Sequence, residues 1–341
     1  MGARARAVAI LAVLSLGSWV LSPALEVAAQ TPLPTPVFHH LHLHSVNPEA
    51  AIDFYTKAFP STSKGTFAGQ PALRSPNNVW VLFNKVAAPP ATQPQTAFWH
   101  FGWHVTDVRA TLDRYLKQNI PLVPLYTGTG EGTGTAFVSS DTYPGTGGVL
   151  GLTRAQIADA KTKGVKPAGG AGFAYLRGPD DSLVEYQGNM PAERFNHIHM
   201  YQEQPFCAAL WYQTHLNAAA PAPRAGQIVR TTANCAVERG PDRTLPALDW
   251  DGMFRTPAVQ TTIFGDVNLY FYMNQGATPL GPTRGQLMDH FAVGVGDLDA
   301  WIAKLRAENV TFLAQSYAIG GLRAVMIEGP SKEAIEIVEV K

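Results

Sequence analysis

The sequence predicts an α+β protein built from four copies of one unit, in which a strand and a helix are followed by further strands. Repeated offsets indicate the copies. His40 precedes Tyr55 by fifteen residues, as His197 precedes Tyr212. Two more offsets, seven residues from histidine to aspartate and six from proline to glutamate, recur in the pairs His100/Asp107, His290/Asp297, Pro179/Glu185 and Pro330/Glu336. Two sets of two histidines and one glutamate predict divalent metal sites with open coordination positions.

Hydrophobic periodicity places the elements of each copy. The first copy begins with a strand at Val37–Ser45, and Asn47 then caps a helix whose first residue is Pro48. Asp107 and Asp297 cap the helices of the second and fourth copies. The other predicted elements are strands at 98–105, 196–201 and 289–295 and a helix at 205–214. Residues 78–84 also resemble residues 268–274, with Asn84 matched to Asn274, which supports a duplication.

The first residues are typical of a secretory signal peptide. Arg4 and Arg6 precede an apolar run, and small residues at 27–29 suit cleavage. We therefore expect a signal peptide at 1–29, a leader at 30–36 and a mature protein that is secreted or periplasmic. A membrane anchor is the alternative, but the run of about 15 residues is short for a span of roughly 20.

The balanced charge of the chain indicates which kinds of binding partner to expect. The formal net charge is +0 and no block of one charge is present, so neither nucleic acid nor, after signal cleavage, a membrane is expected as partner. A small-molecule substrate remains, and the sequence gives no oligomeric state. The only cysteines, Cys207 and Cys235, suit one disulfide in an exported chain.

The four copies group into two halves, 37–190 and 191–341, and each half is expected to form one domain. Two long segments interrupt the repeat, 126–172 and 218–257. The first, with a short helix expected at 153–162, is predicted to be a lid over the N-terminal site, because long insertions inside compact domains are often functional loops. The alternative is a surface elaboration with no access to the substrate. The glycine run at 128–134 does not follow the dinucleotide fingerprint, so no nucleotide cofactor is predicted.

These motifs resemble those of the vicinal oxygen chelate superfamily, which includes glyoxalases, fosfomycin and bleomycin resistance proteins and extradiol dioxygenases. The likeness covers nearly all of the mature chain. It implies four βαβββ modules paired into two domains, whose curved sheets surround a metal. The implied ligands are His40, His100 and Glu185 in the N-terminal half and His197, His290 and Glu336 in the C-terminal half.

Other side chains have candidate catalytic roles. His42, His104 and His199 share strand faces with the implied ligands, so they could act as acid, base or hydrogen-bond donor, or could merely line a polar cup. Tyr175 matches part of the extradiol dioxygenase signature, although Gly178 and Asp181 depart from it and Met326 stands at the matching place in the other half. His39 and His215 are predicted to lie on the surface.

Three functions follow from this pattern. The first is a dioxygenase-type enzyme that uses Fe(II) or Mn(II), with Zn(II) or Ni(II) also possible, on a substrate that chelates the metal through adjacent oxygens. The second is a glyoxalase-like lyase or isomerase with the metal as Lewis acid. The third is a non-catalytic protein that binds a small molecule or a metal.

Overall fold

The computed structural model describes residues 33–123, 162–163, 172–188, 190–223, 228–238, 260–274, 276 and 278–340. The predicted signal peptide, most of the predicted lid with its helix, and residues 224–227 and 239–257 of the 218–257 insertion lie outside the described residues. None of the described helices is long and apolar enough to cross a membrane.

The predicted helix starts are confirmed. Helix α1 (Pro48–Ala58) begins where the Asn47 side chain accepts a hydrogen bond from the Ala50 amide. Helices α2 (Val108–Lys117) and α6 (Leu298–Ala307) begin at Asp107 and Asp297, which cap them in the same way. Helix α5 (Pro205–Leu216) has proline in its first turn and ends at Asn217 in the left-handed conformation. It runs two residues past its predicted end.

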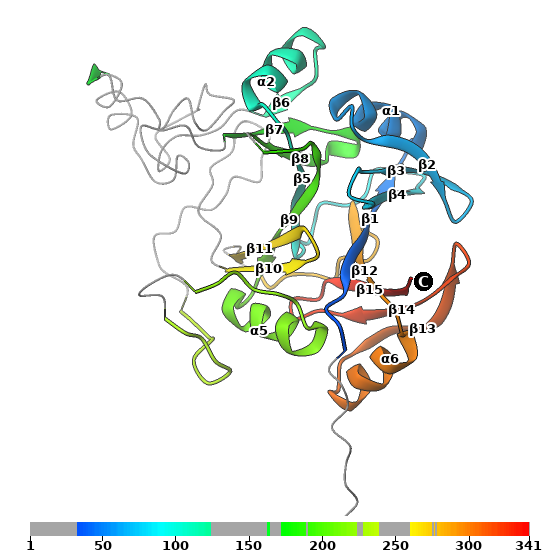
Figure 1. The fold of residues 1–341 in the computed structure, drawn as a ribbon, viewed down its shortest axis with the longest axis vertical. Helices are drawn as coiled ribbons and strands as arrows, with labels where there is room; N and C mark the ends of the chain where they lie inside the picture. The colour runs from blue at the N-terminus through cyan, green and yellow to red at the C-terminus, as the bar shows by residue number, and fades with distance from the viewer. Residues whose placement is uncertain are drawn as a thin grey trace, which may run out of the picture. The chain divides into compact units, whose positions relative to one another are not determined.

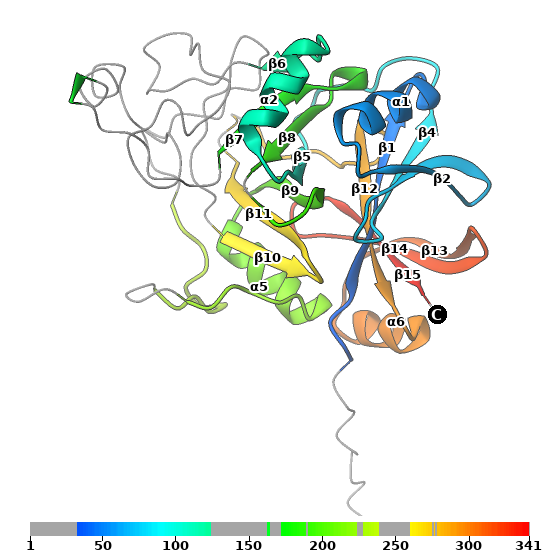
Figure 2. The ribbon, with the colours of Figure 1, turned by 45° about the horizontal axis from the view of Figure 1, so that its top comes forward.

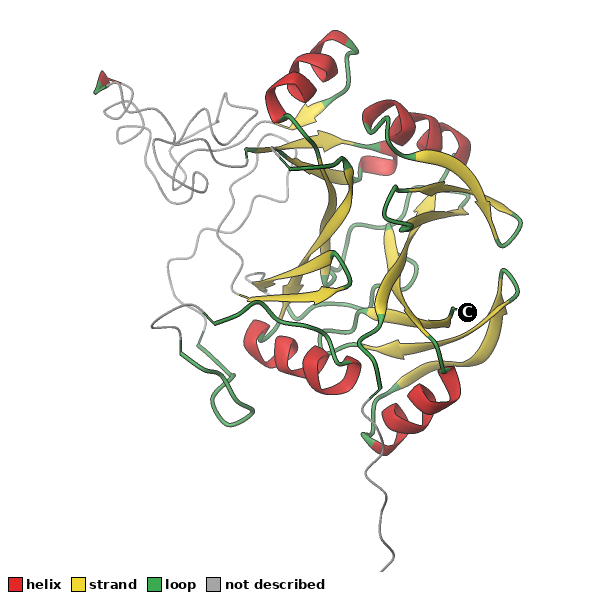
Figure 3. Cartoon of the chain, in the orientation of Figure 1, coloured by secondary structure: helices red, strands yellow, loops and turns green. Residues whose placement is uncertain are grey.

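The strands form two sheets, shown in yellow in Figure 3. The first sheet has eight strands in the order β13-β14-β15-β12-β1-β4-β3-β2. Their bounds are β1 Val37–Ser45, β2 Ser63–Phe67, β3 Gln70–Arg74, β4 Trp80–Lys85, β12 Met288–Val295, β13 Phe312–Ile319, β14 Leu322–Glu328 and β15 Ala334–Glu339.

The second sheet has seven strands in the order β10-β11-β9-β5-β8-β7-β6. Their bounds are β5 Phe98–His104, β6 Leu122–Val123, β7 Phe173–Arg177, β8 Leu183–Gln187, β9 Arg194–Gln202, β10 Gln260–Phe264 and β11 Val267–Met273. A short 3-10 turn, η1 (Pro179–Asp181), joins β7 to β8. The α+β class and the strand-helix-strands plan of the modules are thereby confirmed.

The sheets join modules across the two predicted halves. Strand β1 of the first module pairs antiparallel with β12 of the fourth, and β5 of the second pairs antiparallel with β9 of the third. Figure 2 shows the blue β1 beside the orange β12, although they come from opposite ends of the chain. Each sheet therefore combines modules of both halves, because the first strands of modules one and four complete each other's backbone hydrogen bonds.

The helices, by contrast, associate within the halves. Arg114 of α2 donates to the Ala58 carbonyl at the end of α1, and Lys304 of α6 donates to the His215 carbonyl of α5. Figure 1 accordingly shows α1 beside α2 and α5 beside α6. The helices thus contact each other within the halves, whereas each sheet draws on both halves.

The repeated tyrosine joins a helix to a turn of the neighbouring module. The Tyr55 hydroxyl of α1 lies 2.8 Å from Ser182 Oγ in the turn before β8. At the matching place, the Tyr212 hydroxyl of α5 donates to Glu333 Oε1 at 2.7 Å in the turn before β15. Both hydroxyls are buried, so each needs such a partner. The fifteen-residue offset thus separates a histidine on a strand from a tyrosine on the following helix. The buried hydroxyl of that tyrosine contacts the neighbouring module.

One core cluster includes the inner faces of both sheets. Phe38 of β1 stacks on Phe195 of β9 at 5.6 Å between ring centroids and on Phe291 of β12 at 5.7 Å. Because the inner faces are apolar and closely packed, the polar residues of the central strands lie on the opposite faces. Those faces carry the histidines.

The predicted disulfide is present between Cys207 of α5 and Cys235. It ties residues 228–238 of the 218–257 insertion to the start of α5. Beside it, the Val237 amide donates to Gln204 Oε1. This part of the insertion is therefore anchored to the third module at two adjacent points.

Candidate metal centres

The first sheet gathers His40 and His42 of β1, His290 of β12 and Glu336 of β15 into a group that we call the first-sheet cluster. The ligand atoms of the three histidines lie within 4.8 Å of one another, and His40 Nε2 lies 3.0 Å from Glu336 Oε2. Strand register produces this group, because His42 stands opposite His290, and Ala292, which faces His40, stands opposite Glu336. All four side chains are buried or half-buried.

The second sheet gathers His100 of β5, Glu185 of β8, and His197 and His199 of β9 into the second-sheet cluster. Their ligand atoms also lie within 4.8 Å of one another, and all four residues are at most 1% exposed. His100 Nε2 lies 2.9 Å from Glu185 Oε2, while His199 Nδ1 and His197 Nε2 lie 3.8 and 3.9 Å from the same oxygen. One carboxylate thus faces three imidazoles.

The two clusters occupy equivalent positions in the repeat. His42 faces His290 across β1 and β12, and His199 faces His100 across β9 and β5. The carboxylates stand on the last strands of the fourth and second modules. Each of the six predicted ligands therefore lies in a cluster, but the predicted grouping by halves is wrong. His40 meets His290 and Glu336, whereas His100 and Glu185 meet His197, because the sheets cross the halves.

The four bulged residues of the central strands explain part of this geometry. The register shifts between Phe38 and His40, and the extra residue is His39. Equivalent shifts leave Asp289, Trp99 and Asn196 as the extra residues, each directly before a cluster histidine. A bulge bends the strand and re-aims the side chains next to it. His39 is accordingly half-buried, with Nδ1 2.8 Å from His40 Nδ1, and not on the surface as strict alternation predicted.

Burial sets the protonation state of His40 and His42. It lowers the pKa of His40. Burial, followed by the nearby His290 and His40 rings, lowers the pKa of His42 to about 3. These imidazoles are therefore neutral at pH 7, which is the form that binds a metal ion.

The first-sheet cluster fits a divalent cation. His40 Nε2 and Glu336 Oε2 face each other at 3.0 Å, yet in the described part of the chain neither atom makes a hydrogen bond. Buried polar atoms are normally satisfied, so an orphaned imidazole nitrogen beside an orphaned carboxylate oxygen is the arrangement that a shared cation would complete. Imidazole and carboxylate donors suit Fe(II), Mn(II), Zn(II) and related ions.

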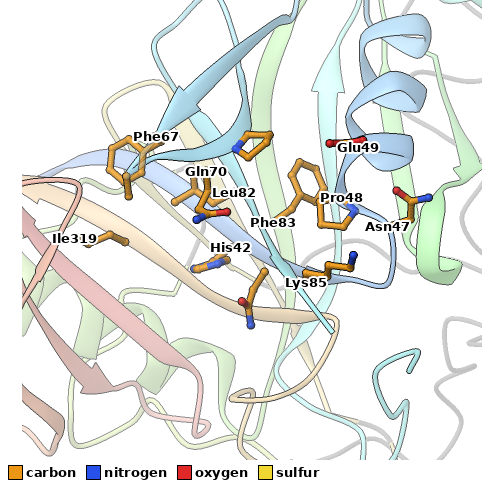
Figure 4. A pocket seen from close by; sticks show the side chains of 13 residues that line it. His42, Asn47, Pro48, Glu49, Phe67, Gln70, Leu82, Phe83, Lys85 and Ile319 are labelled. Atoms are coloured by element: carbon orange, nitrogen blue, oxygen red, sulfur yellow. The ribbon is translucent and has the colours of Figure 1, made fainter. Parts of the chain in front are cut away.

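A cavity of about 580 Å³ adjoins this cluster. Figure 4 shows His42 among its lining residues, with Phe67 and Ile319 toward one end and Asn47 and Lys85 toward the other. Ligand pockets are often of this size and combine apolar walls with a few polar groups. The first-sheet cluster therefore has space beside it for a small molecule.

Two hairpin tips form one side of this cavity. Phe67 and Ala68 come from the β2-β3 hairpin and Ile319 from the β13-β14 hairpin, so the two tips come from the first and last modules. The tips touch, because a Cβ added to Gly320 would lie 3.2 Å from the Ala68 backbone. The right side of Figure 1 shows both hairpins extending from the first sheet.

Aromatic rings surround the second-sheet cluster. The Tyr175 ring packs edge-on against His100 at 5.2 Å, and Tyr270 and Tyr272 of β11 lie 4.8 and 5.3 Å from His199. Gly102 of β5 leaves the room that the His197 ring occupies, since a Cβ there would overlap that ring. The equivalent position in the first sheet is Ala292, two residues after His290.

The predicted catalytic residues fall into different places. His42 and His199 lie inside the clusters, where they can themselves be ligands, and Tyr175 lies beside His100. His104 lies outside the second-sheet group. Burial and then Arg194 lower its pKa to about 4.

The structure adds residues that the sequence did not indicate. Tyr317 of β13 donates to Glu336 Oε1 at 2.5 Å, and Asp289 Oδ1 accepts from His290 Nδ1 at 2.6 Å. The sequence match of Asn84 with Asn274 is displaced by two residues in the structure. Asn84 pairs with His44, which lies four residues after His40. The equivalent residue four after His197 is Tyr201, and it pairs with Tyr272 rather than with Asn274.

Comparison with solved structures identifies the fold. Glyoxalase I from Zea mays matches with a TM-score of 0.55 and 12% identity over 89% of this chain and 92% of that chain. A protein named "putative dioxygenase" from Bacillus subtilis matches with a TM-score of 0.52 and 11% identity over 90% and 86%. No family model and no curated protein sequence matches the chain. The chain therefore has the vicinal oxygen chelate fold that its motifs resemble.

Proposed function

We propose that the protein is an exported, metal-dependent enzyme of the dioxygenase type, acting on a small substrate that chelates the metal through two adjacent oxygens. The observation that carries this proposal is the first-sheet cluster, in which buried His40, His290 and Glu336 lie beside a cavity lined by His42. Metal ligands and space for a substrate coincide there.

The ligand set supports a catalytic rather than a purely structural ion. Two histidines and one carboxylate leave coordination positions open, and this set is typical of non-haem Fe(II) oxygenases. A bound divalent ion would act as a Lewis acid toward two adjacent substrate oxygens. We favour Fe(II) or Mn(II) over Zn(II) or Ni(II), because dioxygen chemistry needs a metal that changes oxidation state.

The chain's own residues would orient the substrate in the cavity. The neutral His42 imidazole lines the cavity, so it can hydrogen-bond to a substrate hydroxyl if it does not itself bind the ion. Phe67 and Ile319 provide apolar contact, and Asn84 and Lys85 provide polar groups. A small, partly apolar substrate with vicinal oxygens suits this lining.

Export is the part of the proposal that rests on the disulfide and on the first residues of the sequence. Disulfides persist outside the reducing cytoplasm, and Cys207 and Cys235 are joined. Mass spectrometry of protein recovered from the producing cells should find a mature chain that begins near residue 30. An intact first segment in the cytoplasmic fraction would contradict export.

The reaction is tested with protein loaded with Fe(II) or Mn(II) and a panel of catechols, α-hydroxyketones and α-ketoaldehyde adducts. Oxygen uptake coupled to product formation, lost in His290→Ala, is the expected result. An isomeric product without oxygen uptake would replace the proposal with the glyoxalase-like lyase or isomerase. Tight binding of a panel member without turnover would leave a binding protein.

A further inference from the structure

We infer that Asp289 is a positioning residue of the first-sheet cluster, which holds His290 so that its Nε2 faces the ion and thereby raises the affinity of this site for divalent cations. The inference rests on the proposed metal binding at this cluster. It concerns a residue that neither the sequence pattern nor the fold assigns to the site.

The contact is short and buried. Asp289 Oδ1 accepts from His290 Nδ1 at 2.6 Å, and the two side chains are only 4% and 5% exposed. An imidazole whose Nδ1 carries the proton has its lone pair on Nε2. That Nε2 lies 3.3 Å from His42 Nδ1, inside the cluster. The carboxylate thus selects the tautomer that can bind an ion.

The carboxylate is itself fixed. Its Oδ2 accepts from the Gly285 amide at 2.6 Å, and Arg284 Nε lies 2.9 Å from Oδ1. In the adjoining backbone, the Thr283 hydroxyl donates to the Asp289 carbonyl at 2.8 Å. These contacts hold the aspartate in place before any ion binds, so little order would have to be gained on binding.

The contact arises from a β-bulge, and each of the four central strands that carry the histidines has such a bulge. Asp289 is the extra residue of its bulge, and the extra residues His39 and Asn196 likewise contact Nδ1 of the next histidine, at 2.8 and 3.2 Å. The same backbone device therefore recurs with different side chains. At the fourth bulge, Trp99 packs its ring edge-on against His100.

Asp289 is the only anionic residue among these four. A carboxylate acceptor makes the imidazole more electron-rich than a neutral acceptor does, and loss of such a partner typically weakens metal binding roughly 10–100-fold. The second-sheet cluster has tryptophan at the equivalent position. The effect of Asp289 should therefore be confined to one of the two clusters.

The test is titration of the metal-free, full-length protein with Co(II) in competition with a chromophoric chelator. We expect Asp289→Asn to weaken one binding step roughly 10–100-fold, to shift the Co(II) absorption bands of that site, and to leave the other step unchanged. Glu333→Gln is the matched control. It alters another buried carboxylate, whose partners are Tyr212, Gln202 and Ser331, and it should leave both steps unchanged.

The outcomes separate the inference from the proposed function. If wild-type protein binds Co(II) and His290→Ala removes one step, but Asp289→Asn binds both ions as wild type does, the inference is overturned and the proposed metal site stands. If His290→Ala also changes nothing, the proposed function fails with it. Should Asp289→Asn not fold, nitrogen NMR of the Zn(II)-loaded wild type decides instead. Protonated Nδ1 and ligated Nε2 in His290 support the inference, and the reverse overturns it.

Discussion

His40 Nε2 lies 3.0 Å from Glu336 Oε2, although His40 belongs to the first strand of the described chain and Glu336 to the last. The contact exists because β1 pairs with β12, and β12 pairs with β15. The first-sheet cluster is therefore built from residues of both halves. Substitutions of two residues far apart in sequence should affect the same metal site when both belong to one cluster. Double variants can therefore test which residues share a site.

We expect metal analysis of the wild-type protein to give two divalent ions per chain. His40→Ala combined with Glu336→Ala should leave one ion, because both residues belong to the first-sheet cluster. His40→Ala combined with Glu185→Ala should leave none, because it alters both clusters. Grouping by halves predicts the opposite pattern, so elemental analysis of these two double variants distinguishes the two arrangements directly.

Gly102→Ala should remove the ion of the second-sheet cluster alone. A Cβ at Gly102 would overlap the His197 ring and would lie 2.5 Å from the Glu185 carbonyl oxygen. The ring must then move away from the other ligands. Ala292→Gly, at the equivalent position in the first sheet, is the control and should retain both ions. Two bound ions in Gly102→Ala would show that His197 is not needed at its present place.

Contact between the two hairpin tips should be measurable as stability. Gly320 and Gly321 both have positive φ, so alanine at either position should cost about 1 kcal/mol of backbone strain. A Cβ added at Gly320 would lie 3.2 Å from the Ala68 backbone, whereas one added at Gly321 would have no atom within 4 Å. Urea unfolding should therefore show a larger loss for Gly320→Ala than for Gly321→Ala. Equal losses would mean that the tips do not press on each other.

The bond between Cys207 and Cys235 should stabilise the fold by about 2–4 kcal/mol, because it restricts the unfolded chain. Denaturant unfolding of the double variant Cys207→Ser with Cys235→Ser checks this value. Reduced wild-type protein is the matched control and should unfold at the same denaturant concentration as the variant. Equal stability of the oxidised protein and the variant would contradict the prediction.

Acid should weaken the contact between α5 and α6. Burial opposes ionisation of Glu308, but hydrogen bonds from Lys304 and His215 outweigh it and lower the pKa of this carboxyl. Because the folded-state pKa lies below the unfolded one, the stabilisation is complete above the ordinary glutamate pKa and is lost as the pH falls through the lowered folded value. Glu308→Gln should remove this part of the acid dependence in unfolding experiments from pH 6 to pH 2. An unchanged acid profile would contradict the assignment.

Local features of the sequence were enough to predict several elements. Asn47, Asp107 and Asp297 cap helices as expected, since a cap depends on residues within one turn of itself. Strand β1 has its predicted bounds for a similar reason, because its alternation is encoded in nine consecutive residues. His39 is half-buried although alternation predicted it on the surface. It is the extra residue of a bulge, which breaks the period of two, and alternation alone does not reveal a bulge.

By itself, the sequence predicted the repeated module and the fold class, because both depend on spacing along the chain. The same spacing singled out six residues that lie in the two clusters, namely His40, His100, Glu185, His197, His290 and Glu336. Which of these residues meet was decided by the tertiary structure. Backbone hydrogen bonds are nearly identical between any two such strands, so spacing cannot say whether β1 pairs with β5 or with β12. Packing of the aromatic core and the Tyr55 and Tyr212 links between modules accompany the observed pairing. Tyr317 likewise reaches Glu336 only through the pairing of β13, β14 and β15. Asp289 contacts its direct neighbour His290 from a bulge, which no local pattern indicated.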